Sequence, residues 1–331
     1  MKQPITILSG MQPTGPLHLG NYLGALRNFV HLQKEYSGQC FFMVADYHSL
    51  TEDFDPEQKQ QQVLELAAEF LAAGLDPKKS TLYVQSDVPE VTELCWIFNS
   101  ITPISFLDRM TQFKDKSARQ AKNINMGLYD YPVLQAADIL LPRANRVPVG
   151  QDQVQHVELT RDIAGFFNRK FGHTFEEPQP LLTEIPKVMS LLDPEKKMSK
   201  SAPGSFVAIS DEPEVIHEKL RRAVTDTGPV TNRSVKSAGV QNLFTLLAQF
   251  GTREDVERFE ELYENGTIRY SDVKELLGTR IADHFAEFRA NRAALLAHPA
   301  TIKKALRDGA KKMKKVAAAT MKEVRKKVGL E

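Results

Sequence analysis

The sequence contains very little cysteine. Cys40 and Cys95 are the only thiols among its 331 residues, and they do not form a CxxC pair. Structural zinc sites and disulfide frameworks need several cysteines at characteristic spacings. We therefore expect neither a structural metal site nor a disulfide-stabilised fold.

Long apolar runs are absent as well. No stretch approaches the roughly 20 residues that a membrane-spanning helix needs, so we expect no membrane contact. The first apolar run already ends at Ser9 and Gly10. It is too short for the core of a signal peptide, and no small-residue cleavage site follows it. The start of the chain is typical of a buried strand in a cytoplasmic protein.

Net charge is also small, at +1, and by itself gives no sign of a nucleic-acid binder. The charge is unevenly spread, because Asp308 and Glu323 are the only acids between Lys303 and Lys327, where lysine and arginine are frequent. A local surplus can bind phosphates even in a neutral protein. Two interpretations stay open for this segment: it contacts nucleic-acid phosphates, or it is a solvated amphipathic helix packed against the rest of the chain.

Hydrophobic periodicity differs between the two parts of the chain. In the first part, short apolar runs alternate with segments whose apolar residues lie three and four positions apart, which predicts parallel strands joined by helices. Asp55 and Pro56 are typical of a helix start, and Gly74 of a helix end. The expected elements are strands at 5–8, 40–45 and 81–84 and helices at about 19–30 and 55–74.

From about residue 206 onward, helices with polar exposed faces predominate. Pro213 is expected to open one helix, and Thr252 with Asp255 has the pattern of a capping box. Ser271 is expected to cap a further helix. The predicted fold class is α/β, with a Rossmann-like doubly wound parallel sheet forming a catalytic domain over residues 1–205, followed by an all-helical domain over residues 206–331.

A glycine-rich segment from Gly10 to Asn21 separates the first expected strand from the first helix. In a doubly wound sheet this turn binds nucleotides, because glycine lets the backbone approach phosphate and helix N–H groups face the ligand. The segment is neither a Walker loop nor a dinucleotide fingerprint. His18 at the helix entrance is suited to donating hydrogen bonds to phosphoryl oxygens. Taken alone, the segment also fits an ordinary turn with a surface histidine.

A second polar segment, Lys197-Met198-Ser199-Lys200-Ser201, lies between an apolar run and a proline–glycine turn. Its lysines suit a mobile loop that neutralises pyrophosphate as it leaves. The same composition also fits a solvated surface turn.

Together the two segments resemble the HIGH and KMSKS motifs of class I aminoacyl-tRNA synthetases. The pattern Pro-Thr-Gly-x-x-His-Leu-Gly-Asn begins at Pro13, and Lys197 opens the second motif. This order and separation are similar to those of the small tyrosine and tryptophan branch. The resemblance to bacterial tryptophanyl-tRNA synthetases covers nearly the whole chain and is weakest in the tail. It is further carried by residues 110–116, 131–138, 147–153 and 223–227.

This resemblance implies an enzyme that activates tryptophan with ATP and transfers it to tRNA. Such phosphoryl-type chemistry depends on positioning and charge neutralisation. Mg²⁺ is expected to accompany ATP, held mainly by the phosphates rather than by a protein cage. The residues implied to be catalytic are His18, Lys116, Lys197 and Lys200. The residues implied to contact ATP are Gln12, Pro13, Thr14, Gly20, Asn21, Gly150, Gln151, Asp152, Val188, Lys197, Met198, Ser199, Lys200 and Ser201.

Selection of the amino acid is expected to centre on Asp138. A carboxylate in an apolar segment is costly unless it is paired, and the resemblance implies that this one accepts the indole N–H of tryptophan. Without the family, a helix-surface aspartate explains it as well. His48 is a further candidate, although a histidine after a strand is more often structural. The other residues implied to hold the side chain are Tyr131, Gln135, Val147, Val149 and Gln112.

Three departures from the bacterial tryptophan pattern are present: the first two keep an alternative side chain open, and the third concerns the geometry ahead of the lysine segment. Gln135 replaces a common methionine, Leu8 replaces a frequent aromatic residue, and residues 184–190 lack the usual Gly-Ala-Arg insertion. The alternative is the tyrosine-specific sister enzyme, which shares the Tyr-x-x-x-Gln-x-x-Asp pattern. A non-catalytic sensor of tRNA or amino acid would be expected to lose His18 or the lysines of the second motif, and this chain keeps them.

The resemblance also implies partners. The helical domain from residue 206 is expected to read the tRNA anticodon, and the family implies a homodimer with its interface near Val88 to Asp108. That stretch is apolar, with Trp96, Phe98, Ile101 and Phe106.

Overall fold

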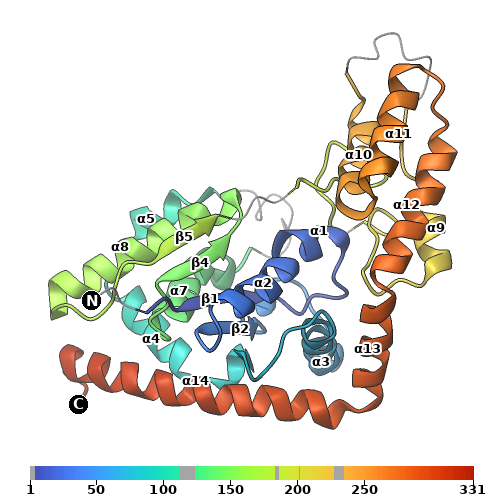
Figure 1. Cartoon of the computed structure of the whole chain (residues 1–331). Coiled ribbons are helices and arrows are strands. Elements are labelled where there is room, and N and C mark those ends of the chain that lie inside the picture. Colours follow the sequence, from blue (N-terminus) through green and yellow to red (C-terminus); the bar gives the residue numbers. More distant parts are fainter. Residues whose placement is uncertain (1–3, 112–123, 183–185, 201, 227–234) are drawn as a thin grey trace. The chain divides into compact units, whose positions relative to one another are not determined.

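The computed structural model describes residues 4–111, 124–182, 186–200, 202–226 and 235–331. The chain forms two compact units, coloured along the sequence in Figure 1. We call residues 1–14, 28–184 and 295–331 the sheet unit, and residues 15–27 and 185–294 the helical unit. These boundaries differ from the predicted division at residue 205, because the C-terminal residues pack with the sheet and the second half of the glycine-rich segment packs with the helices.

The sheet has five parallel strands in the order β3-β2-β1-β4-β5. This order confirms the predicted doubly wound α/β sheet, and the direction of winding reverses between β1 and β4. Ligands bind such sheets at the carboxyl ends of the strands beside this reversal. The strands are β1 (Ile7–Met11), β2 (Cys40–Val44), β3 (Ser80–Val84), β4 (Arg146–Val149) and β5 (Gln179–Leu182).

Strand β1 extends further than the sequence predicted. We expected it to close at Gly10, but Gly10 lies inside the strand and is paired with Met43 on β2. A Cβ at Gly10 would lie 2.5 Å from the Cγ of Met43. Glycine here permits the close approach of two strands and does not end one.

Helices cover both sides of the sheet and follow the predicted pattern of crossovers. The predicted start at Asp55 is confirmed: its carboxylate accepts the Glu57 N–H at 3.0 Å, and Pro56 takes the first helical position. The helices of this unit are α2 (Arg27–Glu35), α3 (Pro56–Ala72), α4 (Glu90–Asn99), α5 (Ile104–Asp108), α7 (Met126–Leu140), α8 (Val154–Phe171) and α14 (Pro299–Val328).

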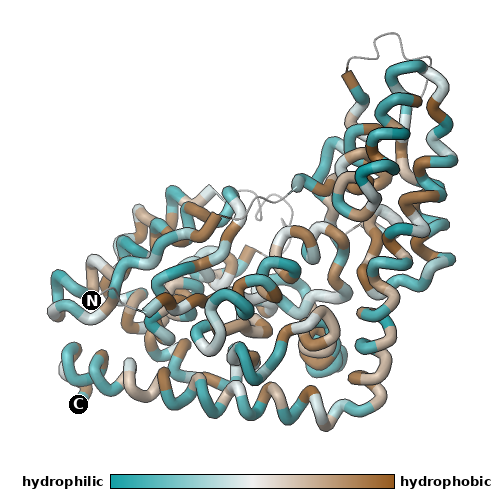
Figure 2. The backbone as a smooth tube through the Cα atoms, viewed as in Figure 1, coloured by the Kyte–Doolittle hydropathy of each residue, from teal (hydrophilic) through white to brown (hydrophobic). Residues whose placement is uncertain are grey.

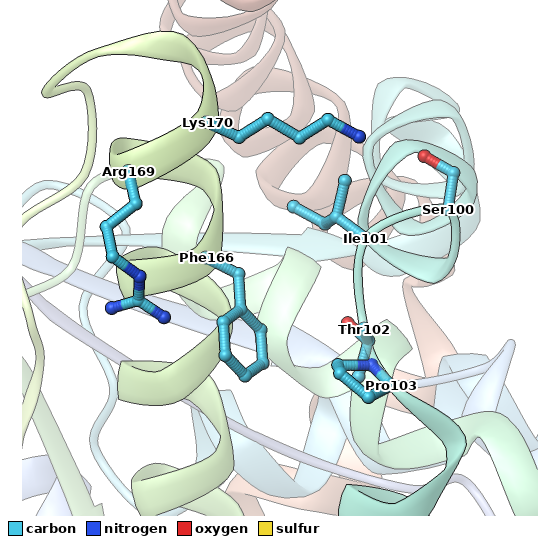
Figure 3. Close-up of a pocket in the computed structure, with 7 residues that line it drawn as sticks. All are labelled: Ser100, Ile101, Thr102, Pro103, Phe166, Arg169 and Lys170. Atoms are coloured by element: carbon cyan, nitrogen blue, oxygen red, sulfur yellow. The ribbon is translucent and has the colours of Figure 1, made fainter.

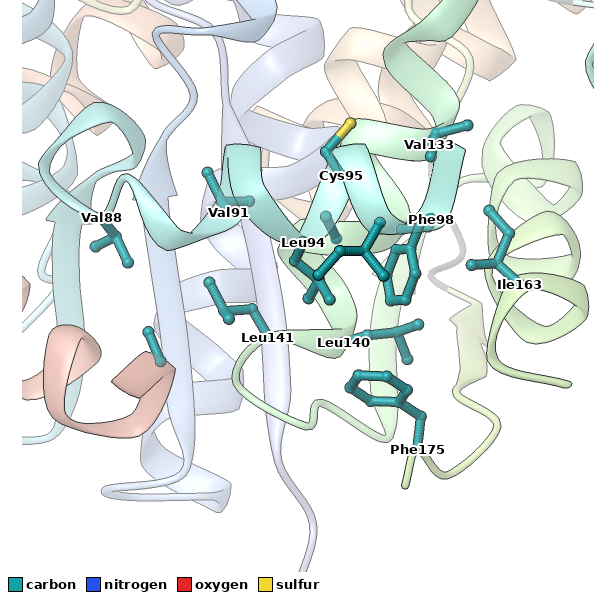
Figure 4. Close-up of a cluster of buried hydrophobic side chains, with 14 of the residues drawn as sticks. Val88, Val91, Leu94, Cys95, Phe98, Val133, Leu140, Leu141, Ile163 and Phe175 are labelled. Atoms are coloured by element: carbon teal, nitrogen blue, oxygen red, sulfur yellow. The ribbon is translucent and has the colours of Figure 1, made fainter. Parts of the chain in front are cut away.

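The main hydrophobic core of the sheet unit lies where α4, α7 and α8 meet. Figure 4 shows Leu94 and Phe98 of α4 directed toward Leu140 of α7 and toward Phe175. Phe98 is fully buried in this cluster. It therefore cannot serve a subunit interface, although the sequence placed it in the stretch expected to form one.

The C-terminal helix α14 is amphipathic and packs on the sheet unit. Teal and brown alternate along it in Figure 2, and it contacts β3, α3 and α4. Gly309 lies so close to β3 that a Cβ there would meet the Leu82 carbonyl oxygen at 1.8 Å. Arg325 donates from Nε to Glu93 of α4 at 2.8 Å. This packing agrees with the interpretation of the basic segment as an amphipathic helix packed against the rest of the chain. The outward-facing lysines remain exposed, so contact with nucleic-acid phosphates stays open as well.

The helical unit begins with a short continuation of the glycine-rich segment. There, α1 (Leu19–Asn21) passes into the π-helical turn η1 (Tyr22–Leu26), where the leucine spacing had predicted regular α-helix. The other helices are α9 (Pro213–Arg221), α10 (Ala238–Phe250), α11 (Arg253–Glu264), α12 (Tyr270–His284) and α13 (Ala286–Ala297), whose last residues belong to the sheet unit.

Two predicted helix starts in this unit have different outcomes. The capping box of Thr252 and Asp255 is confirmed, with both reciprocal hydrogen bonds present. Ser271 is not a cap, because α12 begins at Tyr270 with Arg269 at the N-cap position, two residues before Ser271. None of the helices that the structure describes is both long and apolar enough to cross a membrane.

Candidate active site

In the sheet unit, three buried polar side chains meet at the carboxyl ends of neighbouring strands. His48 follows β2, Gln85 follows β3, and Asp138 lies on α7. His48 Nε2 donates to Asp138 Oδ2 at 2.7 Å, and the Gln85 amide donates to both carboxylate oxygens at 2.8 and 2.9 Å. Asp138 is only 2% exposed. The interpretation of a helix-surface aspartate is therefore wrong.

The orientation of the Gln85 amide is determined by its other contacts. Its Oε1 accepts the backbone N–H groups of Tyr47 and His48, at 3.1 and 3.4 Å. The amide nitrogen must then face Asp138. Burial raises the pKa of Asp138, and the hydrogen bonds from His48 and Gln85 act in the opposite direction. A carboxylate offers about four acceptor positions, so Asp138 retains capacity for one more donor.

Tyr131, one of the residues expected to hold the substrate, is joined to a histidine that the sequence did not single out. Its hydroxyl lies 2.8 Å from His156 Nε2, and the His156 side chain is completely buried. Burial raises the pKa of Tyr131 to about 12, so the hydroxyl keeps its proton near neutral pH. The rings of Tyr131 and His48 meet edge to face with centroids 6.4 Å apart. The Tyr131–His156 pair thus packs against the group formed by His48, Gln85 and Asp138 through this ring contact.

The other residues expected around the amino acid lie on the same elements. Gln135 is partly buried, one turn before Asp138 on α7. Val147 and Val149 lie on one face of β4, where both are buried in a small cluster with Leu8. Leu8, noted as a departure at the sequence level, therefore contributes to the same cluster as the two valines.

Two of the expected ATP-contacting segments follow β1 and β4, the strands that flank the reversal of the sheet. Residues 12–14 come directly after β1, with Pro13 buried. Gly150 follows β4 and opens a short helical turn, in which Gln151 and Asp152 are exposed. Both segments therefore lie where doubly wound sheets bind nucleotides.

In the helical unit, His18 is held in one orientation by Asn21. His18 Nδ1 accepts the Asn21 backbone N–H at 3.2 Å, and Asn21 Oδ1 accepts the His18 backbone N–H at 3.1 Å. Burial, with a smaller effect of the Lys200 charge, lowers the pKa of His18 to about 4. The ring is therefore neutral near pH 7. Because Nδ1 is an acceptor, the proton must be on Nε2, which makes this atom a donor.

The two signature segments lie together in the helical unit although they are far apart in sequence. Lys200 Nζ donates to the Gly15 carbonyl at 2.8 Å. Backbone hydrogen bonds join residues 17–19 to residues 207–209, so the chain just after the lysine segment forms a bridge with the chain around His18. The interpretation of two unrelated surface turns is wrong.

The lysine segment ends a small antiparallel hairpin. Met189 and Lys197 face each other across it, and the pair is flanked by backbone hydrogen bonds between residues 190 and 196 and between 188 and 198. Val188 and Met198 are buried, and a Cβ on Gly20 would lie 3.8 Å from the Val188 side chain. Lys197 is exposed, whereas Ser199 and Lys200 are partly buried. The apolar side chains of Val188 and Met198 thus pack at the base of the hairpin.

Some predicted residues lie outside the described part of the chain, namely Gln112, Lys116 and Ser201. Gln85 and His156 were missed by the sequence analysis. Gln85 carries a usable signal, because it is a polar residue directly after a buried strand that neighbours the strand before His48. His156 lies three residues beyond the family-like segment 147–153. Its role becomes visible only in the folded chain, where it contacts the Tyr131 hydroxyl.

A separate cavity of about 470 Å³ lies in the sheet unit between the end of α4 and the last turns of α8 (Figure 3). It contains none of the signature residues. The cavity is lined by Ser100, Ile101, Thr102, Pro103, Phe166, Arg169 and Lys170.

A metal-binding cluster is not seen among the residues that the structure describes. There, no group of three or more His, Cys, Asp or Glu side chains lies close enough together to hold a metal ion.

Comparison with known proteins gives consistent matches. Residues 1–286 match the family described as tRNA synthetases class I (W and Y). The tryptophan–tRNA ligase of Clostridium tetani is 42% identical over 98% of this chain and 95% of its own length. Tryptophan–tRNA ligase 2 of Streptomyces avermitilis is 45% identical over 98% of this chain and 96% of its own. The structure of tryptophanyl-tRNA synthetase from Campylobacter jejuni, complexed with ADP and tryptophan, superimposes with a TM-score of 0.86 at 36% identity, covering 98% of this chain and 100% of that one.

Proposed function

This chain belongs to the class I tRNA synthetases of the tryptophan and tyrosine type, and we propose that it activates tryptophan with ATP and transfers it to tRNA. The observation that carries this proposal is identity of 42–45% to tryptophan–tRNA ligases over nearly the full length of both chains. The choice of tryptophan over tyrosine rests on these relatives, and the network around Asp138 is compatible with it, because one acceptor position of the carboxylate is left for a single donor such as an indole N–H.

Discrimination follows from the cost of an unpaired buried acceptor. An indole N–H can pair with Asp138, whereas an amino acid without a donor there leaves a desolvated carboxylate without its last partner. Sites of this kind reject the wrong substrate by roughly 10⁴-fold or more. In this proposal His48 and Gln85 orient Asp138, and Tyr131 with Gln135 holds the rest of the substrate. Val147 and Val149 are proposed to line the ring slot, and Gln112 is a further candidate for contact with the substrate.

In the first step, a carboxylate oxygen of tryptophan attacks the α-phosphorus of ATP, and the bond to the bridging oxygen of pyrophosphate breaks. We propose that residues 12–14 with Gly20 and Asn21 position the triphosphate, and that residues 150–152 with Val188 hold the adenosine part. His18 contributes a neutral Nε2–H donor, which suits an oxygen that gains charge in the transition state.

The lysines are proposed to neutralise the leaving pyrophosphate. Lys197 lies in the hairpin and Lys200 follows it three residues later, and Met198, Ser199 and Ser201 are proposed to contact the same phosphates. Lys116 is proposed to add a further charge. We propose that Mg²⁺ enters with ATP and reduces the negative charge that the attacking carboxylate meets.

In the second step, a terminal ribose hydroxyl of tRNA attacks the activated carbonyl carbon, and AMP leaves. We propose that the helices after residue 206 read the anticodon and that the exposed lysines of α14 contact tRNA phosphates. The location proposed for the enzyme is the cytoplasm, where charged tRNA is consumed.

We also propose that the enzyme works as a homodimer. Trp96 on α4 is 75% exposed and Ile104 on α5 is 69% exposed, with the cavity of Figure 3 opening beside the chain that connects them. Large exposed apolar side chains of this kind mark interaction surfaces. Trp96→Glu with Ile104→Glu should convert a dimer to a monomer in analytical ultracentrifugation. A wild-type monomer at micromolar concentration would refute the assembly without affecting the catalytic proposal.

The proposed function is tested by ATP–pyrophosphate exchange with tryptophan and with tyrosine in parallel. Exchange that depends on tryptophan alone is the expected result. Exchange with tyrosine alone would show that tyrosine is the substrate. Gln135, and not the flanking motifs, would then be the residue that indicates which amino acid is selected. No exchange with either amino acid, in a folded protein with intact His18 and Lys200, would remove the chain from the active enzymes.

A further inference from the structure

Asn242 of α10 makes an unusual contact with the base of the lysine hairpin. Its side-chain oxygen accepts the Met189 backbone N–H at 2.9 Å, and its side-chain nitrogen donates to the Met189 carbonyl, also at 2.9 Å. The residue is only 4% exposed. A single buried amide therefore satisfies both backbone groups of one residue, as a neighbouring strand would.

The geometry of the hairpin explains why these backbone groups need an outside partner. The hydrogen bonds across it run between residues 190 and 196 and between 188 and 198, so Met189 and Lys197 form the non-hydrogen-bonded pair between them. In such a pair the N–H and C=O groups point away from the partner strand, while the two residues approach closely. Asn242 holds Met189 from outside, directly opposite Lys197.

The next outward-facing residue of the same strand is held in the same way. The Leu191 carbonyl accepts the Val224 N–H at 2.8 Å, and the Leu191 N–H donates to the Ser205 carbonyl at 2.8 Å. Gly239 of α10 lies against Val224, where a Cβ would come within 2.3 Å of the carbonyl oxygen. The strand that faces Lys197 is therefore fixed along its outer edge, where Asn242 of α10 contributes its side chain and Ser205 and Val224 contribute backbone groups.

We infer that Asn242 is a positioning residue for Lys197, holding the hairpin so that the ammonium group reaches the leaving pyrophosphate. Asn242 touches no substrate in this inference, and it acts only through the backbone of Met189. The inference rests on the proposed adenylation reaction and deepens it. Because displacement of a catalytic group by about 1 Å can cost about 100-fold in rate, a residue that fixes the hairpin has a kinetic effect out of proportion to its distance from the chemistry.

The test compares two substitutions of Asn242 with a control on the same helix. Asn242→Asp keeps the acceptor for the Met189 N–H but places a carboxylate oxygen against the Met189 carbonyl, and Asn242→Ala removes both bonds. Gln241→Ala removes an exposed amide from the adjacent position. We expect both Asn242 variants to lose about 100-fold in kcat of pyrophosphate exchange. KM values for ATP and tryptophan should stay within about threefold, because the affected contact is made in the transition state. Gln241→Ala should match the wild type.

A double-mutant cycle separates positioning from general damage to the fold. In a Lys197→Ala background, Asn242→Ala should cost less than about threefold in kcat, since the group it positions is absent. Losses that multiply in the double variant would overturn the inference, as would Asn242 variants that exchange like the wild type. If Asn242→Ala fails to fold by circular dichroism, the same cycle with Asn242→Asp decides.

The outcomes also separate this inference from the proposed function. A wild type without tryptophan-dependent exchange refutes the function. A wild type with exchange, a strong loss in Lys197→Ala and no loss in the Asn242 variants refutes this inference alone. Exchange that is unaffected by Lys197→Ala refutes both the role of Lys197 and the residue proposed to position it.

Discussion

The amino-acid network of the sheet unit and the lysine hairpin of the helical unit use polar residues in opposite ways. His48, Gln85 and Asp138 are each less than 7% exposed, and every one is bonded to another member of the network. Lys197 is exposed, and Lys200 is partly so. The side chains of the amino-acid network are therefore held in place by one another without a ligand. The lysine side chains, in contrast, remain accessible to water.

The difference corresponds to two different tasks. Recognition of one N–H group needs a desolvated acceptor in a fixed position, because only then does a mismatch leave an uncompensated polar group. Neutralisation of pyrophosphate needs positive charge that reaches a leaving group, and the long side chain of an exposed lysine can do this from a fixed backbone position. His18 is the exception in the helical unit, since it is buried, neutral and held by Asn21.

The largest expected effect tests the buried side of this comparison. Asp138→Ala should lower kcat/KM for tryptophan in pyrophosphate exchange by roughly 10⁴-fold. The reason is that the indole N–H of the substrate, His48 and Gln85 would all lose the carboxylate that accepts their hydrogen bonds. Asp130→Ala on the same helix is the matched control, as this half-buried carboxylate pairs with Asn99 and lies outside the network. A loss below tenfold for Asp138→Ala would contradict its role in selection.

A somewhat smaller effect tests the exposed side. Lys200→Ala should lower kcat of exchange by about 10²–10³-fold with little change in KM for tryptophan, because the charge acts on the developing pyrophosphate. Lys196→Ala serves as the control, since this exposed lysine is on the same hairpin and pairs with Asp193 at 2.7 Å. Equal losses in the two variants would show that general charge matters and that the position of Lys200 does not.

The third prediction concerns the pH dependence of stability at His18. Its folded pKa of about 4 lies below the unfolded value of 6.5, so the neutral ring stabilises the fold fully above pH 6.5, and this contribution is lost as pH falls toward 4. Between pH 7 and pH 5 the loss should be about 2 kcal/mol. Urea unfolding of the wild type and of His18→Gln at both pH values measures the difference. Parallel curves for the two proteins would mean that His18 is not held neutral.

The smallest expected effect concerns the basic face of α14. Replacing Lys311, Lys312, Lys314 and Lys315 with glutamine should weaken tRNA binding about tenfold at 0.1 M salt and flatten its salt dependence. The same four positions changed to arginine keep the charge and should bind like the wild type. Binding and aminoacylation that are unchanged in the glutamine variant would leave α14 as a packing helix only.

Much of the fold could be predicted from the sequence because its signals are local. The cap at Asp55, the capping box of Thr252 and the apolar runs of β2 and β3 each depend on neighbouring residues, and all are confirmed. Errors arose where a distant segment decides. Gly10 continues β1 because Met43 packs over it, and the unit boundaries shift because α14 buries Gly309 against Leu82.

The chemistry of the site divides in the same way. The sequence by itself determined the reaction family, since the segments around His18 and Lys197 have residue types and an order that chance does not bring together, and it singled out Asp138. Only the tertiary structure decided which groups contact the residues of the site: Gln85 and His48 contact Asp138, His156 contacts Tyr131, and Asn242 contacts Met189, which is paired with Lys197. The physical reason is that a buried polar group needs a partner, and folding, not sequence distance, determines which partner is near.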